Sequence, residues 1–116
     1  MKPVVKLLAL FAAVALPLFA AEAKSFQNAS LVDVDCSSKD KVKANPDGHT
    51  RDCAMMCAKS GYGVLVDGKY YKFDAAGSAK ALAALKASSK KDHLRVNVSG
   101  QLDGDTLTVE SLALVD

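Results

Sequence analysis

The side chains in this sequence with the most reactive chemistry are three thiols and one imidazole. They belong to Cys36, His49, Cys53 and Cys57. Cys53 and Cys57 are four residues apart in a segment without helix breakers, so both would project from one helix face, where a bond between them would distort the helix. Disulfides persist in oxidising compartments. The spacing therefore predicts a disulfide from Cys36 to Cys53 or to Cys57, with the remaining cysteine unpaired.

The same four residues support an alternative, a metal-binding or thiol-redox site. His49 comes about one helical turn before Cys53, so it would lie on the same edge, with Cys36 arriving from a neighbouring strand. Three thiolates and an imidazole suit a closed tetrahedral zinc site, and sulfur donors equally suit copper(I). Cys53 near a helix N-terminus would favour a thiolate, although the sequence has no Cys-x-x-Cys pair. We expect no cofactor in the disulfide-linked form, and zinc or copper in the alternative.

No set of catalytic residues can be assembled from the sequence. A Cys–His nucleophile would need a third, orienting group and an oxyanion hole, and neither is identifiable. Tyr62 and Tyr70 are instead candidates for an aromatic surface that stacks on a sugar or a base. We therefore expect a binding or structural protein rather than an enzyme, whose partner is a small molecule or another protein.

The first 23 residues have the pattern of a cleavable secretory signal. A short cationic stretch, Met1–Lys6, precedes an apolar run from Leu7 to Ala21 and the small-x-small sequence Ala21-Glu22-Ala23. Such a signal peptide is cut after the second small residue, and the run is shorter than the roughly 20 residues that span a bilayer. The pattern predicts a bacterial protein that is periplasmic or secreted and has no membrane contact after cleavage.

The remaining chain has room for one domain. Cleavage after Ala23 leaves residues 24–116, for which we expect a flexible polar leader over 24–28 and a single domain over 29–116. The 116-residue chain has a formal net charge of +2, and its lysines are interleaved with acidic residues. Because proteins that bind nucleic acid usually carry a basic stripe, nucleic acid is not an expected partner.

Hydrophobic periodicity divides the domain into five strands and two helices. Alternation over Leu31–Cys36 predicts a first strand with one buried face, opposite Asp33 and Asp35, and residues 37–48 predict a surface loop. A helix is expected from the N-cap Thr50 to a glycine cap at Gly61. The later elements are a hairpin turning at Asp67-Gly68, a helix over 78–87, and two strands, from Leu94 and from Leu107, joined at Asp103-Gly104.

This order of elements predicts a mainly β fold with some helix. Five short strands, with one helix between strands one and two and another between strands three and four, match a small OB-like barrel, whose closure limits exposed strand edges. An open sheet packed by two helices is the alternative. The leading hypothesis is an exported OB-like binding domain whose first helix is tied to the first strand by a cysteine bridge.

Four segments of the chain carry a resemblance to a known class of proteins. They are the strand with Cys36 and the stretches His49–Lys59, Val64–Tyr71 and Val96–Gly100. Together they resemble small, exported, uncharacterised bacterial proteins of the OB-fold-like type. The resemblance covers most of the mature chain. It implies the scaffold but no activity, because this scaffold serves many ligands.

Overall fold

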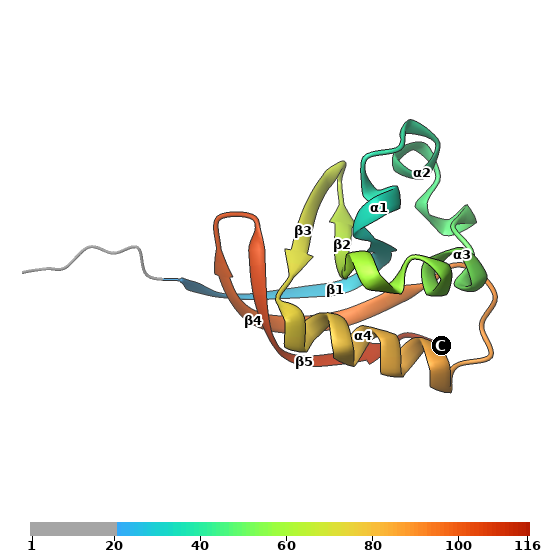
Figure 1. The fold of residues 1–116 in the computed structure, drawn as a ribbon. Coiled ribbons are helices and arrows are strands. Elements are labelled where there is room, and N and C mark those ends of the chain that lie inside the picture. Colours follow the sequence, from blue (N-terminus) through green and yellow to red (C-terminus); the bar gives the residue numbers. More distant parts are fainter. Residues whose placement is uncertain (1–20) are drawn as a thin grey trace, which may run out of the picture.

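The protein folds as a closed barrel of five β-strands, described for residues 21–116 in a computed structural model (Figure 1). The order around the barrel is β1-β2-β3-β5-β4, in which β3 and β5 are parallel and the other neighbours antiparallel. The five-stranded, mainly β fold predicted from the sequence is confirmed, and the closed barrel is consistent with an OB-like scaffold. The strands are β1 (Glu22–Asp33), β2 (Tyr62–Val66), β3 (Lys69–Phe73), β4 (Arg95–Asp103) and β5 (Thr106–Leu114).

Helical segments occupy the two predicted connections, but the first connection is more broken than predicted. Figure 1 shows α1, α2 and α3 gathered beside the end of β1, whereas α4 (Ala75–Ala87) lies along β5. Residues 37–48, expected as a loop, are mostly helical, because Val42 of α2 packs into a small apolar cluster. No helix within residues 21–116 is long and apolar enough to cross a membrane. The segments between β1 and β2 are α1 (Val34–Ser37), α2 (Asp40–Ala44), η1 (Pro46–Gly48), α3 (Arg51–Met56) and η2 (Ala58–Ser60).

Strand β1 begins and ends earlier than the sequence predicted. Residues 24–28, expected as a flexible leader, belong to β1, and residues 24–26 of this stretch pair with β4, with Phe26 opposite Val98. Phe26 is only 7% exposed, so one apolar anchor holds a stretch that is otherwise polar. Residues 1–20 of the predicted signal lie outside the described part of the chain. Cleavage after Ala23 stays a prediction, and it would remove the first two residues of β1.

The barrel interior forms one core to which every strand and α4 contribute. Its fully buried members include Leu31, Val64, Val96 and Leu107 from the strands and Leu85 from α4. A smaller cluster of Val32, Cys36, Val42 and Leu65 lies outside it, beneath α1 and α2. The fragments between β1 and β2 are therefore anchored to the barrel by a few side chains each.

The turn and cap residues behave largely as predicted. Asp67 and Gly68 have φ angles of 49° and 82°, the left-handed conformations that a tight two-residue hairpin turn requires. Thr50 caps α3, since its hydroxyl accepts a hydrogen bond from the Cys53 amide at 3.2 Å. Gly61 ends the helical connection with φ 89°. These local signals were reliable because each depends on only two to four neighbouring residues.

An ion pair between Asp47 of η1 and Arg95 of β4 fastens the connection to the barrel. The Arg95 Nε and Nη2 atoms donate to the two Asp47 carboxylate oxygens at 2.9 and 2.7 Å. The Asp47 carbonyl also accepts a hydrogen bond from the His93 amide at 3.0 Å. The hydrogen bond from Arg95 lowers the pKa of Asp47 below its ordinary value.

Replacing Asp47 by asparagine is expected to lower the free energy of unfolding at pH 7 by about 1 kcal/mol, because a half-buried bidentate pair is lost. The folded-state pKa of Asp47 is depressed, so its contribution is complete above the unfolded-state pKa near 3.8 and fades as the pH falls through the lower folded-state value. Urea unfolding at pH 7 and at about pH 3 measures both. The exposed Asp103→Asn variant is the control, and a deficit that persists undiminished in acid would contradict the pairing.

Candidate functional site

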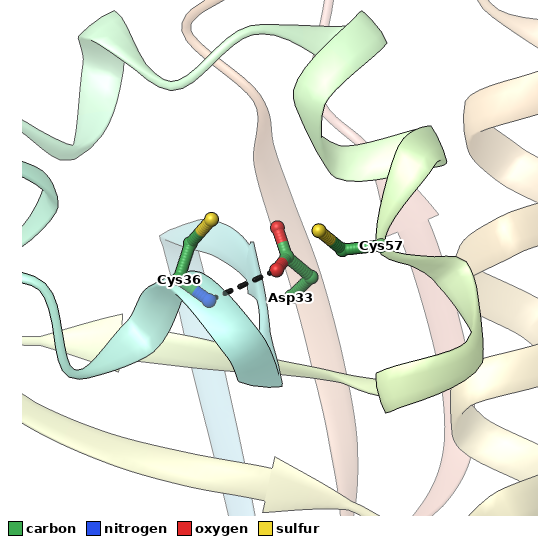
Figure 2. Close-up of side chains that lie close together, drawn as sticks. All are labelled: Asp33, Cys36 and Cys57. Atoms are coloured by element: carbon green, nitrogen blue, oxygen red, sulfur yellow. Dashed lines mark hydrogen bonds between the residues drawn. The ribbon is translucent and has the colours of Figure 1, made fainter.

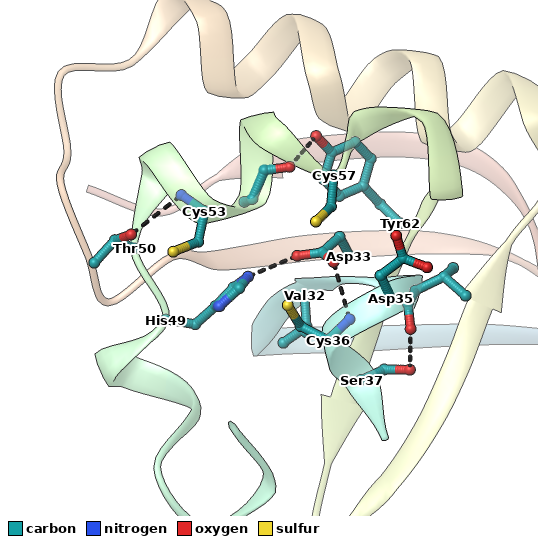
Figure 3. A network of polar contacts seen from close by, with 12 residues as sticks. Val32, Asp33, Asp35, Cys36, Ser37, His49, Thr50, Cys53, Cys57 and Tyr62 are labelled. Atoms are coloured by element: carbon teal, nitrogen blue, oxygen red, sulfur yellow. Dashed lines mark hydrogen bonds and ion pairs between the residues drawn. The ribbon is translucent and has the colours of Figure 1, made fainter. Parts of the chain in front are cut away.

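A buried carboxylate, Asp33, stands at the centre of the site. It is the last residue of β1 and is fully buried, at 0% exposure. Its Oδ2 atom accepts a hydrogen bond from the Cys36 amide at 3.0 Å and so caps α1, and its Oδ1 atom lies 2.7 Å from His49 Nε2 (Figure 3). Burial by itself would raise the pKa of Asp33, but the hydrogen bonds with His49 and the Cys36 amide outweigh it and hold the pKa below its ordinary value. Asp33 is therefore ionised at neutral pH.

Two thiols flank this carboxylate. Figure 2 shows the sulfurs of Cys36, on α1, and of Cys57, at the end of α3, on either side of the Asp33 side chain. One oxygen of Asp33 and the two sulfurs all lie within 4.8 Å of one another. Cys36 is buried and Cys57 is half-buried. Among residues 21–116, these side chains form a group of three donors that are close enough to hold one metal ion.

The electrostatics of the group favour a cation over a free thiolate. Burial, and then the charge of Asp33, raise the pKa of Cys36 to about 11. Burial, followed by the charges of Asp33 and Asp35, also raises the pKa of Cys57. Both thiols are protonated at neutral pH, which argues against the low-pKa nucleophile that redox enzymes use. A buried negative charge between two sulfurs is complementary to a positive ion.

A pocket opens beside the group. It has a volume of about 320 Å³, and its wall includes Cys36, His49 and Cys53 together with Lys39 and Lys41. His49 is buried and held by Asp33, whereas Cys53 is exposed. The pocket therefore gives solvent a route to Cys36 and to the imidazole of His49.

The structure brings together part of the predicted cluster of Cys36, His49, Cys53 and Cys57. Cys36 and Cys57 meet, and His49 joins them through Asp33, but Cys53 does not belong to the group of three donors. No disulfide joins the cysteines, all of which lie in the described residues. Cys57 rather than Cys53 meets Cys36 because of where α3 ends. Helix α3 ends at Met56, so Cys57 has cap dihedrals (φ −101°, ψ 23°) and leaves the helix face that it was expected to share with Cys53.

Sequence reasoning missed Asp33, the residue at the centre. The alternation of Val32 and Val34 with acidic residues placed Asp33 on the exposed face of a strand that was expected to continue to Cys36. The chain instead leaves β1 at Asp33 and turns into α1. Aspartate is a preferred N-cap residue, whose side chain accepts a hydrogen bond from the amide three residues later, here that of Cys36. An interpretation of Asp33 as an N-cap could have identified both the turn and the inward carboxylate.

Tyr62 and Tyr70, the predicted ligand surface, have structural roles instead. Tyr62 is fully buried, and its hydroxyl donates a hydrogen bond to the Ala54 carbonyl at 2.7 Å. The hydroxyl of Tyr70 donates to the Val32 carbonyl at 2.9 Å, and its ring packs on the small cluster that contains Cys36. Tyr62 is therefore unavailable to a ligand, and the hydroxyl of the half-buried Tyr70 is already engaged by a backbone carbonyl.

Comparison of the chain with family models, with curated proteins and with solved structures finds no match in any of the three.

Proposed function

We propose that this protein is a small exported binding domain, not an enzyme, and that it holds a zinc ion between Asp33, Cys36 and Cys57. The observation that carries the proposal is the fully buried Asp33 carboxylate with a sulfur on either side, all three donors within 4.8 Å. A structural network would need Asp33 only as a helix cap and as a partner of His49. A bound ion uses the carboxylate and both thiols together.

The donor set suits zinc in size and in type. With Zn–S and Zn–O bonds of about 2.3 and 2.1 Å, tetrahedral geometry places neighbouring donor atoms about 3.6 to 3.8 Å apart. Three donors within 4.8 Å therefore need to close by roughly 1 Å at most around the ion. Two thiolates with one carboxylate oxygen favour zinc over copper(I), because copper(I) prefers a wholly soft set of donors.

His49 supports the metal site by holding the Asp33 carboxylate in place. The Nε2 atom of its ring lies 2.7 Å from Asp33 Oδ1. Hydrogen bonds of this kind from outside the ligand shell orient a carboxylate that binds a metal. The adjoining pocket reaches Cys36, so a water molecule is the candidate for the fourth position.

Cobalt(II) binding to the reduced protein tests the proposal. Cobalt replaces zinc in such sites, and thiolate ligands give it an intense charge-transfer absorption. We expect this band in the wild-type protein and its loss on addition of zinc. Cys36→Ser and Cys57→Ser should each weaken binding at least tenfold, since each removes a thiolate ligand.

The exposed Cys53 supplies a matched control, because Cys53→Ser removes a thiol from the same segment without touching the three donors. Its cobalt spectrum should keep the charge-transfer band. Absence of the band in the wild-type protein, or its persistence in both Cys36→Ser and Cys57→Ser, would rule out the site. A band that is lost only in Cys53→Ser would move the site to the exposed thiol.

A disulfide between Cys36 and Cys57 is the second candidate for these sulfurs. It is supported by the same separation, at most 4.8 Å, and by the position of Cys57 at the end of α3, outside the regular helix. The bridge would tie the connection to the end of β1 in a structural role. The two candidates exclude each other in one molecule, since a disulfide removes both thiolate ligands.

A further inference from the structure

A second and larger pocket lies along the N-terminal half of β1. Its volume is about 800 Å³, within the range of sites that bind small molecules and short oligomers. One wall is the stretch from Lys24 to Ser30, and the opposite wall is the β2–β3 turn with Lys69 and Tyr71. Lys43 and Pro46 complete it at the end near α2. This groove shares no residue with the proposed zinc site.

The groove gathers positive charge in a protein whose formal net charge is only +2. Its lining includes Lys24, Lys43, Lys69 and Arg95, against the single acidic side chain of Asp67. The guanidinium of Arg95 is already paired with the Asp47 carboxylate. Lys69 lies 3.3 Å from Asp105, but both side chains are more than half exposed, so that pair is weak and exchangeable. Three lysines therefore remain available to an anionic ligand.

A β-bulge adds uncharged hydrogen-bonding groups to the same wall. The pairing of β1 with β4 shifts between Phe26 and Ala29, and Asn28 adopts a positive φ of 54°. The bulge is held in place, since the Asn28 amide donates a hydrogen bond to the Asn97 side chain at 2.8 Å. Gln27 and Asn28 leave the ladder here, exposed and lining the groove. Such bulges frequently re-aim side chains next to binding sites.

We infer that this groove binds an acidic oligosaccharide whose sugar units carry carboxylate groups. Lysine ammonium groups pair with the carboxylates, and the exposed side chains of Ser25, Gln27 and Asn28 suit sugar hydroxyls. The proposal is independent of the zinc site.

Two other classes of anionic chain fit less well. Single-stranded nucleic acid needs successive aromatic platforms, whereas Phe26 is almost buried and Tyr71, packed on it at 4.7 Å, is only partly exposed. An acidic peptide would bind most readily as an added strand along β1. The bulge at Gln27 and Asn28 interrupts the regular row of backbone groups that such a strand would need.

Titration calorimetry with defined oligomers tests the inference. We expect tetragalacturonate to bind and its affinity to fall as salt is added, while neutral maltotetraose, oligothymidylate and tetraglutamate bind at least tenfold more weakly. The double variant Lys24→Gln/Lys69→Gln should lose roughly tenfold in affinity. Gln27→Ala, an exposed position, should lose about threefold, because one amide contact is removed.

The control is Lys80→Gln/Lys86→Gln, which removes two exposed lysines from α4 and leaves the groove intact. It should bind tetragalacturonate as the wild-type protein does. Equal binding of maltotetraose would overturn the acidic class, and tighter binding of oligothymidylate or tetraglutamate would assign the groove to that class instead. No binding of tetragalacturonate at millimolar concentration, or equal losses in the groove and control variants, would refute the inference.

Discussion

Replacing Tyr62 by alanine is expected to lower the free energy of unfolding by about 3 to 5 kcal/mol, one of the two largest effects predicted for this chain. Tyr62 begins β2, is fully buried in the barrel core and donates a hydrogen bond from its hydroxyl to the Ala54 carbonyl of α3 at 2.7 Å. The substitution removes a whole aromatic ring and also releases α3, whose end carries Cys57. Urea denaturation followed by circular dichroism measures the loss.

The matched variant Tyr62→Phe separates the two contributions. It keeps the ring and leaves the Ala54 carbonyl without its partner, so we expect a cost of about 1 to 2 kcal/mol. If Tyr62→Ala cost no more than Tyr62→Phe, the ring would contribute nothing and the core described for the barrel would be incorrect.

The hairpin, the cap of α3 and the alternating strands β4 and β5 could all be predicted because their signals are local. Asp67-Gly68 suits a tight turn whatever surrounds it, and Thr50 needs only the amides that follow it. The beginning of β1 has no such signal. Phe26 is one apolar residue among polar ones, and its burial depends on β3 and β4, which are distant in sequence, as its contact with Tyr71 shows.

The candidate site was likewise predictable only in part. That Cys36 would approach the segment with Cys53 and Cys57 followed from their chemistry, and the structure confirms an approach to Cys57. The choice between Cys53 and Cys57 depended on where α3 ends, which is among the least certain features of a helix. Asp33 was assigned to an exposed face because alternation cannot show that a strand stops and that its last side chain turns inward to cap a helix.

Oxidation of the protein is expected to join Cys36 to Cys57 and to raise the free energy of unfolding by about 3 kcal/mol, because the bridge closes a loop of about 20 residues in the unfolded chain. For a domain of this size the melting temperature should rise by roughly 12 to 24 °C. Native mass spectrometry should find a mass lower by two hydrogens and one thiol, that of Cys53, open to alkylation.

Cys53→Ser should show the same shift in melting temperature, and Cys57→Ser should abolish it. The oxidised wild-type protein should also fail to bind cobalt, since both thiolates are consumed. An oxidised monomer that still gives the cobalt charge-transfer band would mean that the metal and the disulfide do not share Cys36 and Cys57. Oxidation that links Cys53 to another cysteine would instead place the bridge at the pocket and leave Asp33 beside a free thiol.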